Sequence, residues 1–215
     1  MIISASRRTD IPTYYSEWFF NRIEEGYALV RNPMNAHQIS KISLRPDVVD
    51  GIVFWTKNPT PMMTKLDRLK DYTYYFQFTL NAYGQDVEAS IPSKNNVIIP
   101  AFQKLSDMIG PEKVIWRYDP IFLNETYTFE YHIHYFEELA KRLSPYTKKC
   151  TISFLDFYRN TEKTLLDFLS KSLLKKCKSY LPKALWKLQK VTDLKWILVQ
   201  KVLIYKNMEL IMRDV

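Results

Sequence analysis

The sequence is poor in glycine and cysteine, and each shortage excludes a class of function. Its 215 residues include four glycines, too few for the glycine-rich loops that hold phosphates in nucleotide-binding folds. The two cysteines, Cys150 and Cys177, are far apart and belong to no C-x-x-C pair. This excludes a disulfide framework and a zinc site made only of thiolates. The longest apolar runs, such as residues 52–55, are too short to cross a membrane.

The amino terminus lacks the pattern of a secretion signal. Its apolar stretch is only a few residues long, and Arg7 and Arg8 follow that stretch instead of preceding it. We therefore expect a cytoplasmic protein with no membrane partner. Hydrophobic residues make up 47% of the chain and charged residues 25%, a balance typical of a folded globular domain.

The net charge of +8 is unevenly distributed along the chain. Residues 171–215 contain eleven Lys or Arg and three Asp or Glu, whereas residues 1–170 contain twenty of each kind. A protein with one continuous basic face for nucleic acid would not show this division. We predict a domain over residues 1–170 followed by a basic tail over residues 171–215.

Short apolar or aromatic runs alternate with helical patterns along the first domain. The patterns predict strands at 1–6, 51–56, 74–80, 113–118 and 151–155, and helices at 12–25, 61–70, 96–109, 128–143 and 161–169. A further strand pair is predicted at 27–31 and 38–44, around a turn at 32–35. In the first helix, spacing predicts an inward stripe of Tyr15, Trp18, Phe19, Arg22 and Ile23.

Repeated strand–helix units indicate an α/β fold with parallel strands joined by right-handed crossovers. A doubly wound sheet and a (β/α) barrel both satisfy this pattern. Polar residues follow all five predicted strands, whereas a doubly wound sheet concentrates its site at one switch point. We therefore favour a TIM-like or partial (β/α) barrel that is incomplete at its C-terminal end.

The polar residues at these strand ends are the candidate binding residues. Arg7, Arg8, Lys57 and Arg117 supply cations, Asp10, Asp119 and Asp156 supply carboxylates, and Asn58 and Gln77 supply amides. Guanidinium groups bind carboxylate or phosphate, and aspartates accept hydrogen bonds from hydroxyl or amine groups. The set predicts a small molecule or nucleotide as ligand. Alternatively, Arg117–Asp119 and Arg8–Asp10 are ion pairs that only hold loops in place.

Other reactive residue types have structural explanations. Trp55 and Trp116 have the flat rings needed to stack on a ligand, but we expect each of them to fill the barrel interior instead. His132 and His134 are two residues apart on a predicted helix, so they point in different directions and make a poor metal pair. We expect no metal ligands here, and we expect Cys150 to be a buried small hydrophobic residue.

Several long motifs carry a family resemblance. Residues 3–12, 30–33, 54–59, 116–121 and 153–156 resemble the bacterial family known as domain of unknown function 1848. The resemblance covers about the first 165 residues. It implies a partial barrel related to radical S-adenosylmethionine enzymes, with a cysteine-rich iron–sulfur motif at the C-terminal end. Residues 56–59 are similar to a strand end in spore-photoproduct-lyase-like proteins, which implies a nucleotide or nucleic-acid substrate by analogy.

The chain departs from the family pattern in its cysteines. The resemblance implies a [4Fe–4S] cluster and S-adenosylmethionine for an intact member, and such a cluster needs about three neighbouring thiolates. Here no cysteine follows Cys177. With free choice of synonymous codons, the chain from Lys175 onward, read one nucleotide out of register, yields a string with the family's cysteines. We therefore predict a frameshift near residues 165–175, and no cofactor in this chain.

Three hypotheses follow from the sequence. In the first, the chain is a truncated, cluster-less and inactive form of a radical S-adenosylmethionine-like enzyme. In the second, it is a metal-free barrel that binds a nucleotide, with a basic tail that contacts nucleic acid. In the third, the shortened barrel is a poorly folded fragment with an open sheet edge.

Overall fold

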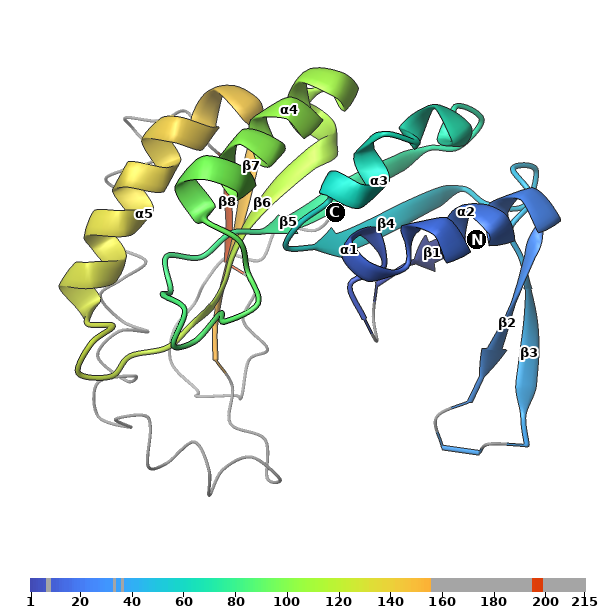
Figure 1. Cartoon of the computed structure of the whole chain (residues 1–215), viewed down its shortest axis with the longest axis horizontal. Helices are drawn as coiled ribbons and strands as arrows, with labels where there is room; N and C mark the ends of the chain where they lie inside the picture. Colours follow the sequence, from blue (N-terminus) through green and yellow to red (C-terminus); the bar gives the residue numbers. More distant parts are fainter. Residues whose placement is uncertain (7–8, 33, 36, 156–194, 199–215) are drawn as a thin grey trace, which may run out of the picture.

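A six-stranded parallel sheet forms the centre of the molecule (Figure 1). The computed structural model describes residues 1–6, 9–32, 34–35, 37–155 and 195–198. The sheet has the order β1-β4-β5-β6-β7-β8, and every neighbouring pair is parallel. Its strands are β1 (Ile2–Ser4), β4 (Gly51–Thr56), β5 (Tyr74–Thr79), β6 (Val114–Ile121), β7 (Lys149–Phe154) and β8 (Lys195–Leu198).

Short helices and one antiparallel hairpin complete the described chain. The α-helices are α1 (Ile11–Tyr14), α2 (Ser16–Glu25), α3 (Thr60–Met63), α4 (Ile99–Ile109) and α5 (Phe129–Leu143). Single helical turns lie at Leu66–Leu69, Lys94–Ile98, Pro111–Lys113 and Ser144–Tyr146. The hairpin consists of β2 (Tyr27–Arg31) and β3 (Ile39–Ser43). No helix in the described ranges is long and apolar enough to cross a membrane.

The strand order confirms an α/β fold built on parallel strands. Neighbouring strands of the sheet follow one another along the chain without any reversal, whereas a doubly wound sheet requires one. Helices α3, α4 and α5 lie on the same side of the sheet in Figure 1. The described strands do not close into a barrel, because β1 and β8 are the two edges of the sheet. Strand β8 lies within the predicted tail, and the predicted helix at 161–169 lies outside the described residues.

The first predicted helix differs most from its sequence pattern. Tyr15 has non-helical backbone angles, so the helix predicted over 12–25 is divided into α1 and α2. Tyr15 and Trp18 are about half exposed, and the predicted inward stripe is therefore wrong at these positions. The side of α2 that packs inward carries Ser16, Phe19, Phe20 and Ile23. This stripe has the same helical spacing, rotated by one residue, because the break at Tyr15 changes where the helix begins.

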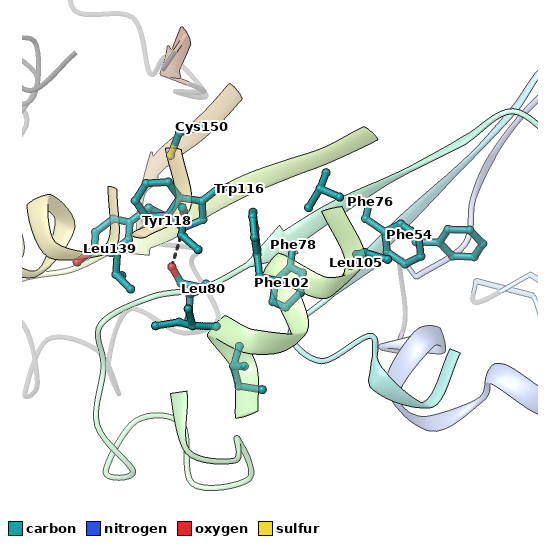
Figure 2. Packing of buried hydrophobic residues seen from close by; sticks show 14 of the residues in the cluster. Phe54, Phe76, Phe78, Leu80, Phe102, Leu105, Trp116, Tyr118, Leu139 and Cys150 are labelled. Atoms are coloured by element: carbon teal, nitrogen blue, oxygen red, sulfur yellow. Dashed lines mark hydrogen bonds between the residues drawn. The ribbon is translucent and has the colours of Figure 1, made fainter. Parts of the chain in front are cut away.

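The main core lies between the sheet and its helices. Phe54, Phe76 and Phe78 occupy neighbouring strand positions on this face, and the rings of Phe54 and Phe76 stack 4.9 Å apart. Further along the sheet, the Trp116 indole nitrogen donates to the Leu80 carbonyl oxygen at 2.9 Å (Figure 2). Trp116 therefore packs between the sheet and the helices, against Phe136 of α5. The sequence-based expectation that it fills a barrel interior is wrong. Cys150 is fully buried in this core, as predicted.

His132 is a core residue on α5. Its Nε2 lies 2.9 Å from the Phe122 carbonyl oxygen, and its Nδ1 lies 2.9 Å from the Tyr118 hydroxyl. Since a carbonyl oxygen only accepts, Nε2 carries the proton, and Nδ1 accepts from Tyr118. Burial lowers the pKa of His132 to about 4, although the bond to the Phe122 carbonyl opposes this shift. The imidazole is therefore neutral at physiological pH.

We expect acid to destabilise the fold through His132. Its pKa of about 4 in the folded chain lies below the 6.5 of the ordinary side chain, so the unfolded chain takes up the proton first. Stability contributed by the neutral ring is present above pH 6.5 and is lost as the pH falls towards 4. The free energy of unfolding measured in urea should be about 2 kcal/mol lower at pH 5 than at pH 7.5 because of His132. His132→Gln should remove that difference, whereas the exposed control His134→Gln should retain it. An unchanged pH dependence in His132→Gln would show that other groups cause it.

Candidate functional site

Polar side chains gather where the parallel strands end. Because all strands run in the same direction, their carboxyl ends meet at one edge of the sheet. Two clusters form there. The first joins the turn after β1, the end of β4 and the loop after β5, and the second crosses β4, β5, β6 and β7 on the sheet face that points away from the core helices.

Asp10 ties the turn after β1 to the end of β4. One of its oxygens accepts from the Thr13 backbone nitrogen at 3.0 Å and caps α1. Its other oxygen accepts from the Thr56 hydroxyl at 3.0 Å and from the Lys57 backbone nitrogen at 2.8 Å. Both carboxylate oxygens are thus used within the protein, and Asp10 positions Lys57.

Asn58 shapes the same junction. Its side-chain oxygen accepts from the Thr60 backbone nitrogen at 3.2 Å, at the start of α3. Its backbone carbonyl accepts from the Thr13 hydroxyl at 2.8 Å. These contacts turn the chain away from β4, which leaves Lys57 at the edge of the sheet.

A buried glutamate holds two lysines in the first cluster. Glu88, from the loop after β5, is only 8% exposed. One of its oxygens pairs with the Lys57 ammonium, and the other lies 2.5 Å from the Lys94 ammonium. Lys94 also donates to the Tyr83 carbonyl oxygen. Burial lowers the pKa of Lys94, and the hydrogen bond to Glu88 opposes that effect. The three groups carry a net charge of +1, and the Lys57 side chain, 41% exposed, presents it to solvent.

The second cluster centres on Arg117 and Asp119. The Arg117 guanidinium donates through Nε and Nη2 to one oxygen of Asp119, with Nε at 3.2 Å. The other Asp119 oxygen accepts from the Ser153 hydroxyl on β7. The guanidinium carbon lies 4.4 Å from the ring centroid of Trp55 on β4, and Nη1 lies 3.5 Å from the Gln77 side-chain oxygen on β5. Side chains from four neighbouring strands thus meet in one contact network.

A register shift in β6 brings Asp119 into this network. Tyr118 pairs with Ile152, but Ile121 pairs with Phe154, so β6 has one extra residue in this interval. The Asn81 side chain holds the shifted segment, because it accepts from the Asp119 backbone nitrogen at 2.7 Å and donates to the Asp119 carbonyl at 2.9 Å. Such irregularities often redirect a side chain next to a functional site.

The face that carries the second cluster becomes more polar towards the strand ends. Alternation along the strands places Val53, Tyr75 and Ile115 near the start of this face, opposite the core residues. Gln77, Thr79, Arg117, Asp119 and Ser153 follow on the same side. We call this surface, with Trp55, the open face, because helices α3, α4 and α5 lie on the other side of the sheet. Val53 and Ile115 on it are nevertheless buried, and the Arg117 and Asp119 side chains are only 12% and 20% exposed. A face meant only for packing would remain apolar along its length, since buried charges cost free energy.

The structure places six of the nine predicted binding residues. Asp10, Lys57 and Asn58 meet in the first cluster, and Gln77, Arg117 and Asp119 meet in the second. Arg7, Arg8 and Asp156 lie outside the described residues. The ion pair between Arg117 and Asp119, which the sequence predicted as an alternative to ligand binding, is formed.

Sequence reasoning missed Glu88, Lys94 and the role of Ser153. Glu88 and Lys94 lie in or just after a loop with no periodic pattern, so nothing in the sequence distinguishes them from solvent-exposed charges. Ser153 alternates with the core residues Ile152 and Phe154 of β7. This alternation was the one sequence signal that it points to the open face.

A separate apolar hollow lies beside the first cluster. It has a volume of about 300 Å³ and is lined by Thr9, Ile11, Tyr15 and Trp18. None of the six predicted binding residues that the structure describes lines it.

Metal ligands are not grouped in the part of the chain that the structure describes. No set of three or more His, Cys, Asp or Glu side chains is arranged there to hold a metal ion. Cys150 is buried, and burial raises the pKa of its thiol well above the ordinary value. It is therefore a neutral thiol in the core, whereas a metal ligand is a thiolate.

Comparison with known proteins identifies a family. The model of the family described as Domain of unknown function (DUF1848) matches residues 2–204. The match extends past residue 170, where the charge of the sequence changes. The search of curated proteins and the search of solved structures return no match.

Replacing Glu88 should reveal its part in holding the first cluster. In Glu88→Gln, the Lys57 and Lys94 ammonium groups lose their counter-charge, and Lys94 is left partly buried and unpaired. We expect the free energy of unfolding to fall by about 2 kcal/mol, less than for a fully buried pair because Lys57 reaches solvent. Glu138→Gln, at an exposed pair on α5, is the control and should change stability by less than about 0.5 kcal/mol. Equal effects in urea unfolding would contradict a buried role for Glu88.

Proposed function

Because the chain belongs to the DUF1848 family, whose description assigns no activity, we propose a function from its own geometry: it binds an anionic, nucleotide-like small molecule at the carboxyl edge of the sheet. The observation that carries this proposal is the open face, where side chains of four neighbouring strands form one polar network. No catalytic residue is assigned.

The strand order supports a partial-barrel architecture for this site. Sequential parallel strands with helices on one side leave the other face as the inner wall of an open cylinder. Barrel enzymes bind their ligands at the carboxyl ends of the strands. A site at this edge therefore agrees with the architecture that we propose.

The chemistry of the two clusters supports the class of ligand. The net positive charge that Lys57 presents suits a carboxylate or phosphate. Trp55 is the second-last residue of β4, and Lys57 follows the strand directly. The Gln77 amide nitrogen and Asp119 offer a donor and an acceptor for hydroxyl or amino groups. An anion that carries polar groups and a ring matches this combination.

The resemblance to radical S-adenosylmethionine enzymes helps to choose candidate ligands, but it does not support an iron–sulfur cluster in this chain. S-adenosylmethionine offers a carboxylate, hydroxyl groups and a ring, but its ammonium and sulfonium groups make it a net cation, so AMP matches the proposed anionic class more closely. A [4Fe–4S] centre does not fit this chain, since it needs about three thiolates. The 215 residues contain two cysteines, and Cys150 is buried in the core. We propose that the chain binds its ligand without such a centre. A frameshift near residues 165–175 is a separate proposal, and it must account for a family match that continues to residue 204.

Ligand binding should be visible as thermal stabilisation of the full chain. We expect S-adenosylmethionine, S-adenosylhomocysteine or AMP to raise Tm in differential scanning fluorimetry. At a concentration of 100 times Kd the stabilisation is about 2.7 kcal/mol, or a rise of about 5–10 °C. Lys57→Met and Gln77→Leu should each reduce the rise by more than half.

The matched control is Lys148→Met, which removes an exposed lysine next to β7. It should keep the full rise in Tm. Failure of all three ligands would overturn the proposed ligand class, and equal loss in the control would show that the binding is non-specific charge attraction.

Anaerobic treatment with iron and sulfide tests the proposed absence of a cluster. We expect no stable brown chromophore after desalting, because two separated cysteines cannot hold the cluster. Cys150→Ala should behave in the same way as the parent chain. A chromophore with about four irons per chain would contradict the proposal. The nucleotide sequence across codons 160–215 tests the frameshift directly.

A further inference from the structure

The loop after β5 is bound to the loop after β6 and to α5 through tyrosine hydroxyls, and the two loops lie side by side in Figure 1. The Tyr131 hydroxyl donates to the Ala82 carbonyl oxygen at 2.7 Å. The Tyr127 hydroxyl accepts from the Gly84 backbone nitrogen at 3.0 Å and donates to the Asp86 carboxylate. Loops are usually more mobile than the elements they connect, whereas these contacts fix the first residues of this loop to its neighbour.

Tyr83, in the same loop, holds the backbone beside the second cluster. It is 4% exposed, and its ring stacks on Phe122 with the centroids 4.5 Å apart. Its hydroxyl donates to the Pro120 carbonyl oxygen at 2.7 Å and accepts from the Phe122 backbone nitrogen at 3.1 Å. Pro120 directly follows Asp119 in the chain. The hydroxyl therefore fixes the backbone that carries the Asp119 carboxylate, because a buried backbone group left without a partner costs free energy.

The backbone of Tyr83 belongs to the first cluster. Its carbonyl oxygen accepts a hydrogen bond from the Lys94 ammonium. Lys94 also pairs with Glu88, and Glu88 in turn pairs with Lys57. Tyr83 thus contacts the first cluster through its carbonyl oxygen and the backbone of the second cluster through its hydroxyl.

Strand β4 provides a second link between the clusters. The ring centroid of Trp55 lies 4.4 Å from the guanidinium carbon of Arg117, and Lys57 follows Trp55 two residues later in the chain. The clusters are therefore joined on the strand side by β4 and on the loop side by Tyr83. A site whose parts are held in place before binding loses little freedom when its ligand arrives. This arrangement favours one ligand with two recognised ends over two separate ligands.

We propose that the two clusters are the halves of one site for a nucleoside monophosphate, and that Tyr83 is a positioning residue that keeps the halves at a fixed separation. This inference rests on the function proposed above and names the ligand of that same site. The phosphate binds the Lys57 ammonium, and the hydroxyl or amino groups of the nucleoside bind the Gln77 amide and the Asp119 carboxylate. Because both ends belong to one molecule, its affinity exceeds that of either part alone.

The test measures binding of AMP, inorganic phosphate and adenosine to the full chain by isothermal titration calorimetry. The parent chain should bind AMP at least about tenfold more tightly than either part. Tyr83→Phe keeps the ring that stacks on Phe122 and removes the hydroxyl. It should weaken AMP binding roughly tenfold, because the halves lose their fixed separation, and leave the affinities for phosphate and adenosine within about two-fold. A loss of stability alone would not separate AMP from its parts in this way.

Tyr72→Phe is the matched control. The Tyr72 hydroxyl also donates to a backbone carbonyl oxygen at 2.7 Å, that of Leu44, but Tyr72 precedes β5 and lies at the amino ends of the strands. This variant should bind AMP within about two-fold of the parent chain. Tyr131→Phe is a second, milder variant, because Tyr131 is partly exposed and the change releases the Ala82 carbonyl oxygen. It should weaken AMP binding about three-fold, and it replaces Tyr83→Phe in the test if circular dichroism shows that Tyr83→Phe does not fold.

Three results would overturn this inference while the proposed function stands. In the first, the parent chain binds AMP no more tightly than phosphate or adenosine, so the clusters hold separate ligands. In the second, the tyrosine variant keeps the full affinity for AMP. In the third, the variant weakens the binding of all three compounds equally, which assigns the hydroxyl a role in folding alone. Absence of binding by all three compounds would instead overturn the proposed function, and this inference with it.

Discussion

The alternation of side chains across an all-parallel sheet is the constraint on which the rest of this structure depends. Every second residue of β4, β5, β6 and β7 packs under the helices, and the residues between them must point the other way. Since the four strands are parallel and adjacent, their outward-pointing residues lie side by side on one face of the sheet. The open face is thus a consequence of building the core, and its chemistry is set by residues that the core does not use.

The charged groups that the structure describes at this edge are compatible with the fold because each has a partner. Asp10 accepts three hydrogen bonds, Glu88 holds two ammonium groups, and Asp119 accepts from Arg117 and Ser153. Removing a partner would leave a partly buried charge, which costs more than the pair contributes. The same contacts that stabilise the edge also fix where Lys57 and Arg117 can present their remaining donors. Stability and the geometry of binding are therefore linked at this edge.

Much of the fold follows from patterns in the sequence. The strand at Gly51–Thr56 and the hairpin strands were predicted within a residue or two, because β-branched and aromatic runs bounded by turn residues are strong local signals. The first helix was less predictable. A break of one residue at Tyr15 rotates the inward stripe, and helical periodicity alone cannot locate such a break. Trp116 and Trp55 look alike in sequence, yet one is buried under α5 and the other contacts Arg117.

By itself the sequence determined the α/β class, the places where strands end and the residue types found there. Those properties depend on local periodicity and on turn residues, which neighbouring positions encode. Only the tertiary structure decided that Glu88 joins Lys57 to Lys94 and that Arg117 reaches Trp55, Gln77 and Asp119. Most of these contacts join residues that are distant in the chain. They form because strand order and register bring separate segments to one edge of the sheet, information that no single segment contains.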